Sequence, residues 1–342
     1  MEPVRTGIIG CGPRTRNGHA PALQAAANAE LVAVCDLIED LAREVATQFG
    51  VRYYTDHREM LAAADVESVV IVTATKFHAD LALDVVAAGK HVLCEKPLAD
   101  DLDKARELVA CAEAAGLRGG VGYQGRFRPE LQALKAHAAE VEPVQMLINR
   151  PRGVMSLPYL LPDPLCGIMD YISHDLDLAL WVMGREPLAV SACLRRGIYT
   201  DTQAIDLLTA TIEFGPSEDK ATATVVSTMG GAGLGVTYQV VGRRGYAALG
   251  LGGPRAARLE PDESGVLKPQ SCPLEFESLR GNGATLLMHE HFARCIRDPD
   301  LPLEPCASLA DGLRALEVAL AIVEAGETGC RIPFPLRPGG PS

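Results

Sequence analysis

The first 123 residues alternate short apolar runs with helical segments, and this alternation constrains the fold more than any other feature of the chain. The run at 68–73, SVVIVT, is nearly all β-branched or apolar, which is typical of a strand buried on both faces of a parallel sheet. Further strands are expected at 4–10, 31–35, 91–94 and 119–123, with helices at 17–28, 38–49, 78–88 and 100–116 and one opening at 56. Residues 1–123 are therefore predicted to form a doubly wound α/β domain.

Residues 124–342 show a different pattern and are expected to form a second domain. Strands are predicted at 144–149, 188–195, 205–214, 221–229, 235–241 and 246–249, helices at 168–183, 285–297 and 309–325, and an exposed loop at 250–272. Several strands alternate polar and apolar residues, which predicts a mostly antiparallel open sheet. The chain offers too few helices to cover both sheet faces, so we expect one face to form a homodimer or homotetramer interface.

Charge and composition exclude several classes of function. The 342 residues carry 32 Lys and Arg against 44 Asp and Glu, a net charge of −12 that repels the phosphates of nucleic acids. No apolar run approaches the roughly 18 residues of a membrane span, and the first strand starts too early to leave room for a signal peptide. The chain is thus expected in the cytoplasm. Its ten cysteines form no C-x-x-C pair, so we interpret them as reduced core residues and expect no metal site.

The residues that end the predicted strands are the first candidates for chemistry, because ligands of doubly wound sheets bind beyond the carboxyl ends of the strands. The turn after the first strand contains Gly10 and Gly12, followed by Pro13 and Arg14. Glycines at these positions allow the backbone to approach a pyrophosphate. Thr15 stands where a third glycine is expected, so the glycines alone remain weak evidence, since such turns also occur for packing.

Asp36 strengthens the cofactor interpretation. It ends the second predicted strand, where a carboxylate binds the ribose hydroxyls of an adenosine. The same carboxylate would repel a 2′-phosphate, and Leu37 and Ile38 follow it in place of Lys or Arg, which favours NAD over NADP. A helix cap for 38–49 is the structural alternative for Asp36, and it is compatible with ribose binding.

At Glu95, Lys96 and Pro97, within HVLCEKPLA, the sequence resembles the Gfo/Idh/MocA oxidoreductases. The resemblance continues through GIIGCG at 7–12, ELVAVCD at 30–36, TAT with His78 at 73–78, GYQGRF at 122–127, DYISHDLD at 170–177, HEHF at 289–292 and LADGLRAL at 309–316. It implies an NAD(P)-dependent enzyme acting on sugars or polyols, built from a Rossmann domain and an open-sheet α/β domain.

The resemblance also implies site residues. Those expected to bind the cofactor are Gly10, Gly12, Pro13, Arg14, Asp36, Thr73, Thr75, His78, Glu95, Lys96 and Gln124. Lys96, Asp170 and His174 are expected to carry catalysis and to bind substrate. Separately from the resemblance, Arg126 and Arg152 belong to a local excess of basic residues and are candidates to bind a carboxylate or phosphate of the substrate, with a solvated surface as the alternative. The four-residue spacing of Asp170 and His174 places both on one helix face, where a carboxylate raises the pKa of an imidazole and orients it.

Other interpretations stay open at this point. His174 alone is equally consistent with a buried helix histidine bound by its neighbouring carboxylate. His289 and His291 resemble a metal pair, but residues two apart on a helix diverge, so packing is expected. An NAD-dependent glycosidase that acts by transient oxidation, or a non-catalytic NAD-bound regulator, are the competing functions for the whole chain.

Overall fold

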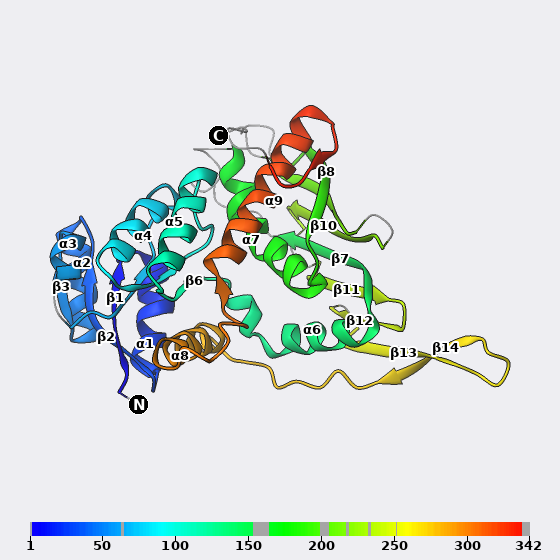
Figure 1. The fold of residues 1–342 in the computed structure, drawn as a ribbon, viewed down its shortest axis with the longest axis horizontal. Helices are drawn as coiled ribbons and strands as arrows, with labels where there is room; N and C mark the ends of the chain where they lie inside the picture. The colour runs from blue at the N-terminus through cyan, green and yellow to red at the C-terminus, as the bar shows by residue number, and fades with distance from the viewer. Residues whose placement is uncertain are drawn as a thin grey trace. The chain divides into compact units, whose positions relative to one another are not determined.

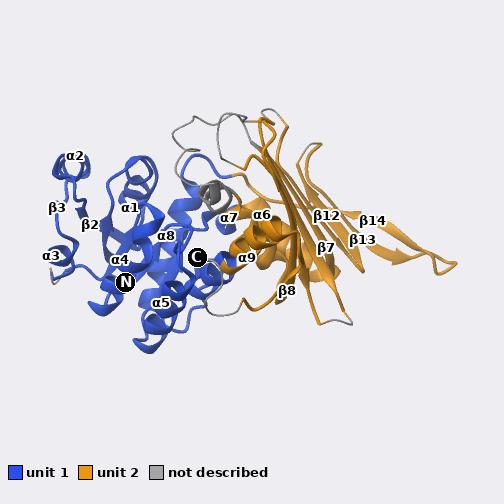
Figure 2. Cartoon of the chain, turned by 90° about the horizontal axis from the view of Figure 1, so that it is seen from above, with its two compact units in different colours: residues 1–128, 279–316, 342 blue, residues 129–278, 317–341 orange. Residues whose placement is uncertain are grey.

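The structure is a computed structural model that describes residues 2–62, 65–152, 164–198, 205–216, 219–231, 234–250 and 252–336, with the backbone alone for residues 152 and 164–171. Two compact units divide the chain (Figure 2). The first comprises Met1–Arg128 and Leu279–Leu316, and the second comprises Pro129–Ser278 and Glu317–Pro341. The sequence division at residue 123 assigned 279–316 to the second domain, whereas these residues pack within the first unit.

A seven-stranded sheet forms the centre of the first unit (Figure 1). Its strands, in spatial order, are β15 (Ala307–Ser308), β6 (Gly119–Val121), β5 (His91–Cys94), β4 (Ser68–Ile71), β1 (Val4–Ile9), β2 (Ala29–Cys35) and β3 (Arg52–Tyr54). The order 3-2-1-4-5-6 with parallel pairing is that of a Rossmann fold, which confirms the predicted doubly wound sheet. Sequence reasoning missed β3 because its three residues are largely exposed and carry no buried apolar run.

Helices connect these strands. They are η1 (Thr15–His19), α1 (Ala20–Ala25), α2 (Glu39–Phe49), α3 (His57–Ala62), η2 (Thr75–Phe77), α4 (His78–Ala87), α5 (Leu102–Ala114) and η3 (Gln124–Phe127). Gly50 ends α2 in the left-handed region at φ 72°, as expected for a glycine C-cap. The carboxylate of Asp101 caps α5 by accepting from the backbone N–H of Lys104 at 2.9 Å.

Helix α8 (Gly283–Arg297) explains why residues 279–316 belong to the first unit. Met288, Phe292 and Ala293 are buried in the same apolar cluster as Ile8 and Val34 of the central strands. After α8, β15 pairs antiparallel with β6 and extends the sheet at its edge. The apolar face of α8 is therefore buried only when this late segment returns to the first sheet.

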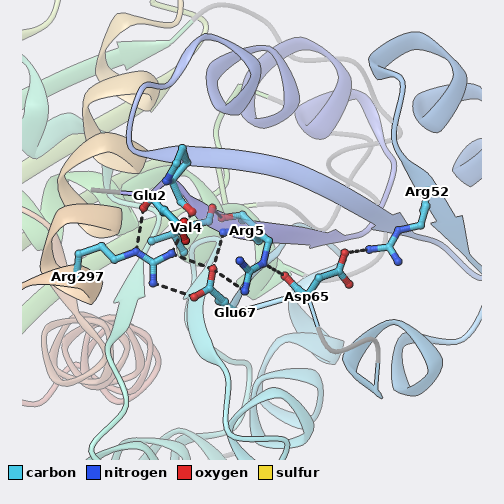
Figure 3. Close-up of polar contacts among 9 residues, drawn as sticks. Glu2, Val4, Arg5, Arg52, Asp65, Glu67 and Arg297 are labelled. Atoms are coloured by element: carbon cyan, nitrogen blue, oxygen red, sulfur yellow. Dashed lines mark hydrogen bonds and ion pairs between the residues drawn. The ribbon is translucent and has the colours of Figure 1, made fainter.

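A polar cluster fastens α8 at the amino ends of the strands (Figure 3). Both oxygens of Glu67 accept from Arg297, at 2.8 and 2.9 Å, and one also accepts from the backbone N–H of Arg5 at 3.1 Å. Arg297 donates further to the carbonyls of Glu2 and Pro3 at 3.0 Å. Arg297 holds the pKa of Glu67 at about 2, below its ordinary 4.5, despite the opposing effect of partial burial.

The second unit is built on a nine-stranded sheet that is antiparallel except between β7 and β10. Its strands, in spatial order, are β14 (Leu267–Cys272), β13 (Arg255–Pro261), β12 (Gly245–Leu249), β11 (Thr237–Gly242), β7 (Pro143–Arg152), β10 (Ala221–Met229), β9 (Leu207–Phe214), β8 (Pro187–Arg195) and β16 (Ile332–Pro333). The expected loop at 250–272 is wrong, because β13 and β14 form a hairpin there. Both strands are largely exposed and carry Gly- and Pro-rich flanks, so their sequence lacks the usual strand pattern.

Helices cover one face of this second sheet, as Figure 2 shows for α6 (Pro129–Val141) and α7 (Pro164–Met183). Helix α9 (Leu309–Thr328) begins in the first unit and ends in the second. The strands bury alternate residues, and their other face exposes the apolar side chains of Leu147, Val226, Val241 and Tyr246. The expected open sheet is therefore present. Helix α6 was not predicted from the sequence.

The structure tests the predictions about the cysteines and about membrane-spanning segments. Cys111, Cys193 and Cys330 are exposed, so the interpretation of all cysteines as core residues is wrong for these three. Cys11, Cys35, Cys94, Cys295 and Cys306 are buried. Within the part of the chain that the structure describes, none of the helices is long and apolar enough to cross a membrane.

Candidate functional site

The turn after β1 passes through a space that only glycine fits. Gly10 has φ +99°, and a Cβ on it would lie 2.3 Å from the carbonyl oxygen of Val72, at the end of β4. Its N–H donates to the carbonyl of Cys35, at the end of β2, at 2.8 Å. Gly10 therefore brings the turn close to the carboxyl ends of both neighbouring strands.

The next part of the turn leaves room for a ligand. A Cβ on Gly12 would meet nothing within 4 Å, so the missing side chain opens space beside the backbone. Thr15, in the place of the third glycine, is buried, and its hydroxyl donates to the carbonyl of Gly10 at 2.6 Å. Thr15 also begins the π-helical turn η1, which absorbs an extra residue compared with an α-helix. The altered glycine pattern thus corresponds to a wider first turn.

Asp36 lies at the end of β2 and faces the same turn. Its Oδ2 accepts from the backbone N–H of Cys11 at 2.8 Å, and its Oδ1 accepts from Ile38 at 2.9 Å. The Asp36 side chain is half-buried, and each of its carboxylate oxygens can accept one more hydrogen bond. The carboxylate can therefore bind two ribose hydroxyls while it keeps its bonds to the backbone. Burial, followed by the charge of Asp36, raises the pKa of the Cys11 thiol to about 12 and keeps it neutral.

Glu95, after β5, is the centre of a buried polar cluster. Its Oε1 accepts from Nε of Arg14 at 2.9 Å and from Nε2 of His19 at 2.8 Å, while its Oε2 accepts from the backbone N–H of Lys96 at 3.1 Å. Burial alone would raise the pKa of this carboxyl, but the charges of His19, Arg14 and Lys96 hold it well below its usual range. Glu95 therefore ties the turn after β1 to the segment that carries Lys96.

Arg14 is held in place from several directions. In the amide orientation that satisfies its neighbours, the Gln124 oxygen accepts from Nη2 of Arg14 at 2.8 Å. A Cβ on Gly18 would lie 2.9 Å from Nη1 of Arg14, so this glycine makes room for the guanidinium. The Arg14 side chain is 38% exposed, and a fixed, accessible guanidinium is suited to a phosphate.

The histidines around Glu95 were not foreseen as a cluster. Nδ1 of His19 lies 3.0 Å from Nε2 of His289 on α8, and both rings are buried. Burial, then the charges of His19 and Arg14, lowers the pKa of His289 well below 6.5. His291 faces away, toward the carbonyls of Pro302 and Leu303, which confirms that the two α8 histidines diverge. His19 and His289 are 270 residues apart, and no sequence spacing could relate them.

Beyond β4, Thr73 and Thr75 are half-buried, and His78 is buried as the first residue of α4. Nδ1 of His78 lies 2.7 Å from the carbonyl oxygen of Pro97, and Nε2 lies 3.0 Å from that of Thr73. His78 was expected to contact the cofactor, but both of its ring nitrogens face main-chain carbonyls instead.

Two predicted residues lie on α7 of the second unit. His174 is half-buried, between the buried side chains of Ser173 and Asp175. The side chain of Asp170 lies outside the described residues. Asp175 pairs with Nε of Arg150 on β7, and the Arg150 guanidinium lies 5.7 Å from the ring centre of Tyr238. These contacts fasten the His174 turn of α7 to the sheet.

The remaining substrate candidates lie elsewhere. Arg126 is buried, and its Nη1 lies 3.3 Å from Oδ2 of Asp311 in the first turn of α9. This position favours a role for Arg126 in fastening that turn. The side chain of Arg152 lies outside the described residues. In the first unit, the structure therefore brings together the glycine turn, Asp36, Arg14, Gln124 and the Glu95–Lys96 segment.

Comparison with known proteins matches two separate segments of the chain. Residues 4–123 match the family model described as an oxidoreductase family with an NAD-binding Rossmann fold, and residues 166–248 match the GFO/IDH/MocA C-terminal domain. The chain is 32% identical to UDP-N-acetylglucosamine 3-dehydrogenase of Acidithiobacillus ferrooxidans. This alignment spans 232 residues, 66% of this chain and 69% of that protein.

Two further similarities concern inositol dehydrogenases. Over 193 residues the chain is 34% identical to inositol 2-dehydrogenase of Rhizobium meliloti, an alignment that spans 55% of this chain and 58% of that relative. The crystal structure of a putative myo-inositol dehydrogenase from Sinorhizobium meliloti 1021 superposes with a TM-score of 0.76 at 26% identity, over 97% of this chain and 100% of that one.

Proposed function

Because this chain belongs to the GFO/IDH/MocA family of oxidoreductases, we propose that it transfers a hydride between NAD and a secondary alcohol or ketone of a sugar or polyol. One observation carries the proposal. Three features lie at the carboxyl ends of strands of one Rossmann sheet: the open turn at Gly12 after β1, the carboxylate of Asp36 after β2, and the Glu95-anchored Lys96 after β5.

The residues present fit NAD. Gly10 allows the tight turn after β1, and Gly12 gives the backbone close approach to a pyrophosphate. Arg14 offers the pyrophosphate a fixed positive charge, and Asp36 offers acceptors to ribose hydroxyls. When bound, NAD supplies the acceptor for the hydride. Leu37 and Ile38, which follow Asp36, are 84% and 59% exposed and carry no positive charge for a 2′-phosphate, which supports NAD over NADP.

We assign the proton chemistry to Lys96, Asp170 and His174, as the family resemblance implies. Oxidation of an alcohol requires a base for the hydroxyl proton and a positive charge beside the developing alkoxide. His174 accepts the proton, Lys96 stabilises the oxygen, and Asp170 binds substrate or relays the proton. Arg152 remains a candidate for the substrate, whereas the burial of Arg126 argues for a packing role.

The substrate class follows from the relatives. One is a UDP-N-acetylglucosamine 3-dehydrogenase and another an inositol 2-dehydrogenase, and both names describe oxidation of a ring hydroxyl. We therefore propose a cyclic polyol or a sugar ring. None of these observations favours a glycosidase or a non-catalytic regulator.

We also propose that the chain forms a homodimer or homotetramer through the open face of the second sheet. Val226, Val241 and Tyr246 are 36–44% exposed on that face, and apolar side chains exposed on an open sheet face are suited to a subunit interface. Sedimentation at micromolar concentration should give an assembly larger than one chain, and a monomer alone would contradict this proposal.

The activity is tested by following NAD reduction with myo-inositol, scyllo-inositol, glucose and a UDP-sugar. Turnover is expected with at least one of them. Lys96→Ala and His174→Ala should each lower kcat by about 10² or more, while NAD affinity changes little. Near-normal kcat in both variants would contradict the assigned roles, and release of an aglycone from a glycoside without net NAD reduction would support the glycosidase instead.

A further inference from the structure

His78 is a buried titratable group that the proposed mechanism does not use. Its residue exposure is 1%, and its ring lies between two main-chain carbonyl oxygens, 2.7 Å from Pro97 and 3.0 Å from Thr73. Pro97 follows Lys96 directly, and Thr73 follows β4, so the ring bridges the segments that leave two neighbouring strands.

We propose that His78 is a positioning residue for Lys96, acting through a hydrogen bond from its Nδ1–H to the carbonyl of Pro97. The inference rests on the proposed function, since it explains how the chain places the lysine that acts on the substrate oxygen. It assigns no contact between His78 and either substrate or cofactor.

The number of protons on the His78 ring determines how many of the two carbonyls it can donate to. Carbonyl oxygens only accept, and a neutral imidazole has a single N–H, so it makes a true hydrogen bond to one of the two carbonyls. Burial, reinforced by the charge of Lys96, lowers the pKa of His78 against the opposing effects of the two carbonyls and Glu95, which favours the neutral ring. The shorter contact, to Pro97, then identifies Nδ1 as the protonated nitrogen.

This bond completes the restraint on Lys96. On its amino side, the backbone N–H of Lys96 donates to Oε2 of Glu95 at 3.1 Å. On its carboxyl side, Pro97 has no N–H of its own to anchor the chain, and its carbonyl is held by His78. With both neighbours fixed, the backbone of Lys96 keeps one orientation, and a misplacement of about 1 Å in a reacting group can cost as much as 10² in rate.

Two amide substitutions separate the two contacts. The amide nitrogen of an asparagine lies near the position of Nδ1, and that of a glutamine reaches the position of Nε2. His78→Asn can therefore donate to Pro97, whereas His78→Gln can donate to Thr73. The expected kcat falls by about threefold or less in His78→Asn and by about tenfold or more in His78→Gln and His78→Ala.

Affinity and structure supply independent readouts. Calorimetric titration should give a Kd for NAD within about twofold of wild type in both amide variants, because His78 is buried and makes its contacts inside the protein. In the cofactor-free wild type, ¹⁵N NMR of the His78 ring should show the Nδ1–H tautomer. His57→Gln is the matched control, since His57 bonds to Asp84 on α4 at 2.7 Å without reaching Pro97, and it should leave kcat unchanged.

The outcomes are distinct. Equal kcat in His78→Asn and His78→Gln, or an Nε2–H tautomer, would overturn the inference. A loss that appears only in NAD affinity would overturn it as well and would return His78 to a cofactor-binding role. A wild-type chain that oxidises none of the polyols or sugars would contradict the proposed function instead, and the tautomer would then decide the inference alone.

Discussion

The two ends of the seven-stranded sheet each carry a glutamate that binds an arginine and is linked to α8. At the amino ends, Glu67 binds Arg297 of α8; at the carboxyl ends, Glu95 binds Arg14 and reaches His289 of α8 through His19. Residues 289 and 297 lie about 12 Å apart along the helix axis. Helix α8 is thus held both at the amino ends and at the carboxyl ends of the strands.

The two clusters differ in burial and in what they border. The side chain of Glu67 is 24% exposed and that of Glu95 8%. Glu67 contacts Arg5 and Arg297 at the amino ends, whereas Glu95 borders the glycine turn and Lys96. Since ligands of such sheets bind at the carboxyl ends, we infer that the Glu67 cluster serves stability and the Glu95 cluster serves both stability and the site.

The largest expected effect belongs to Glu95→Gln. This change keeps the shape but removes the charge that Arg14 and His19 face, and breaking a buried ion pair costs about 3–5 kcal/mol. The variant should also bind NAD more weakly, because Arg14 loses its anchor. Urea unfolding and NAD titration measure both effects, and a free energy of unfolding within about 0.5 kcal/mol of wild type would contradict the role of Glu95.

A smaller and purely structural effect is expected from Arg297→Ala. Loss of this partly exposed, bidentate pair should lower the free energy of unfolding by about 1–2 kcal/mol. Turnover at 25 °C should remain at the wild-type value, because the pair lies at the opposite end of the sheet from the site. Reduced kcat in a fully folded Arg297→Ala protein would contradict the inference that the Glu67 cluster serves stability alone.

The smallest effect is a pH dependence of stability from Glu67. Its pKa in the folded chain is about 2, below the ordinary 4.5, so the ionised form stabilises the folded state. This contribution, about 1 kcal/mol after solvent screening, is fully present above about pH 5 and is lost as pH falls toward 2. The difference in unfolding free energy between wild type and Glu67→Gln should shrink from pH 6 to pH 3, and a constant difference would contradict the shift.

Much of the first unit was predictable because its signals are local. The buried β-branched run at 68–73, the glycine turn and Asp36 each follow from a few adjacent residues. The Rossmann sheet confirms the predicted strand, and it places the glycine turn and Asp36 after β1 and β2. The family motif at Glu95–Pro97 located the polar segment after β5. The division at residue 123 missed the return of α8, since nothing adjacent in sequence shows which sheet a late amphipathic helix covers.

The parts that were missed depend on long-range contacts or weak patterns. The His19–His289 contact joins residues 270 apart, and the two carbonyls around His78 come from separate loops. Most side chains of the hairpin β13–β14 are exposed, and the buried residues Ala256 and Ala257 are adjacent in sequence, so the hairpin lacks the alternation that marks half-buried strands. The π-helical turn that begins at Thr15 has one signal in the sequence, the glycine that stands at residue 18 where one is expected at residue 15.

The comparison between the two ends is tested most directly by one calorimetric titration of NAD into wild type, Asp36→Ala and Arg297→Ala. Asp36→Ala removes the carboxylate beside the glycine turn and should weaken NAD binding by about tenfold or more, the loss of about 1.4 kcal/mol expected for hydrogen bonds to a charged group. Arg297→Ala should bind NAD within about twofold of wild type. Unchanged binding in Asp36→Ala, or a comparable loss in Arg297→Ala, would contradict a cofactor site at the carboxyl ends of the strands.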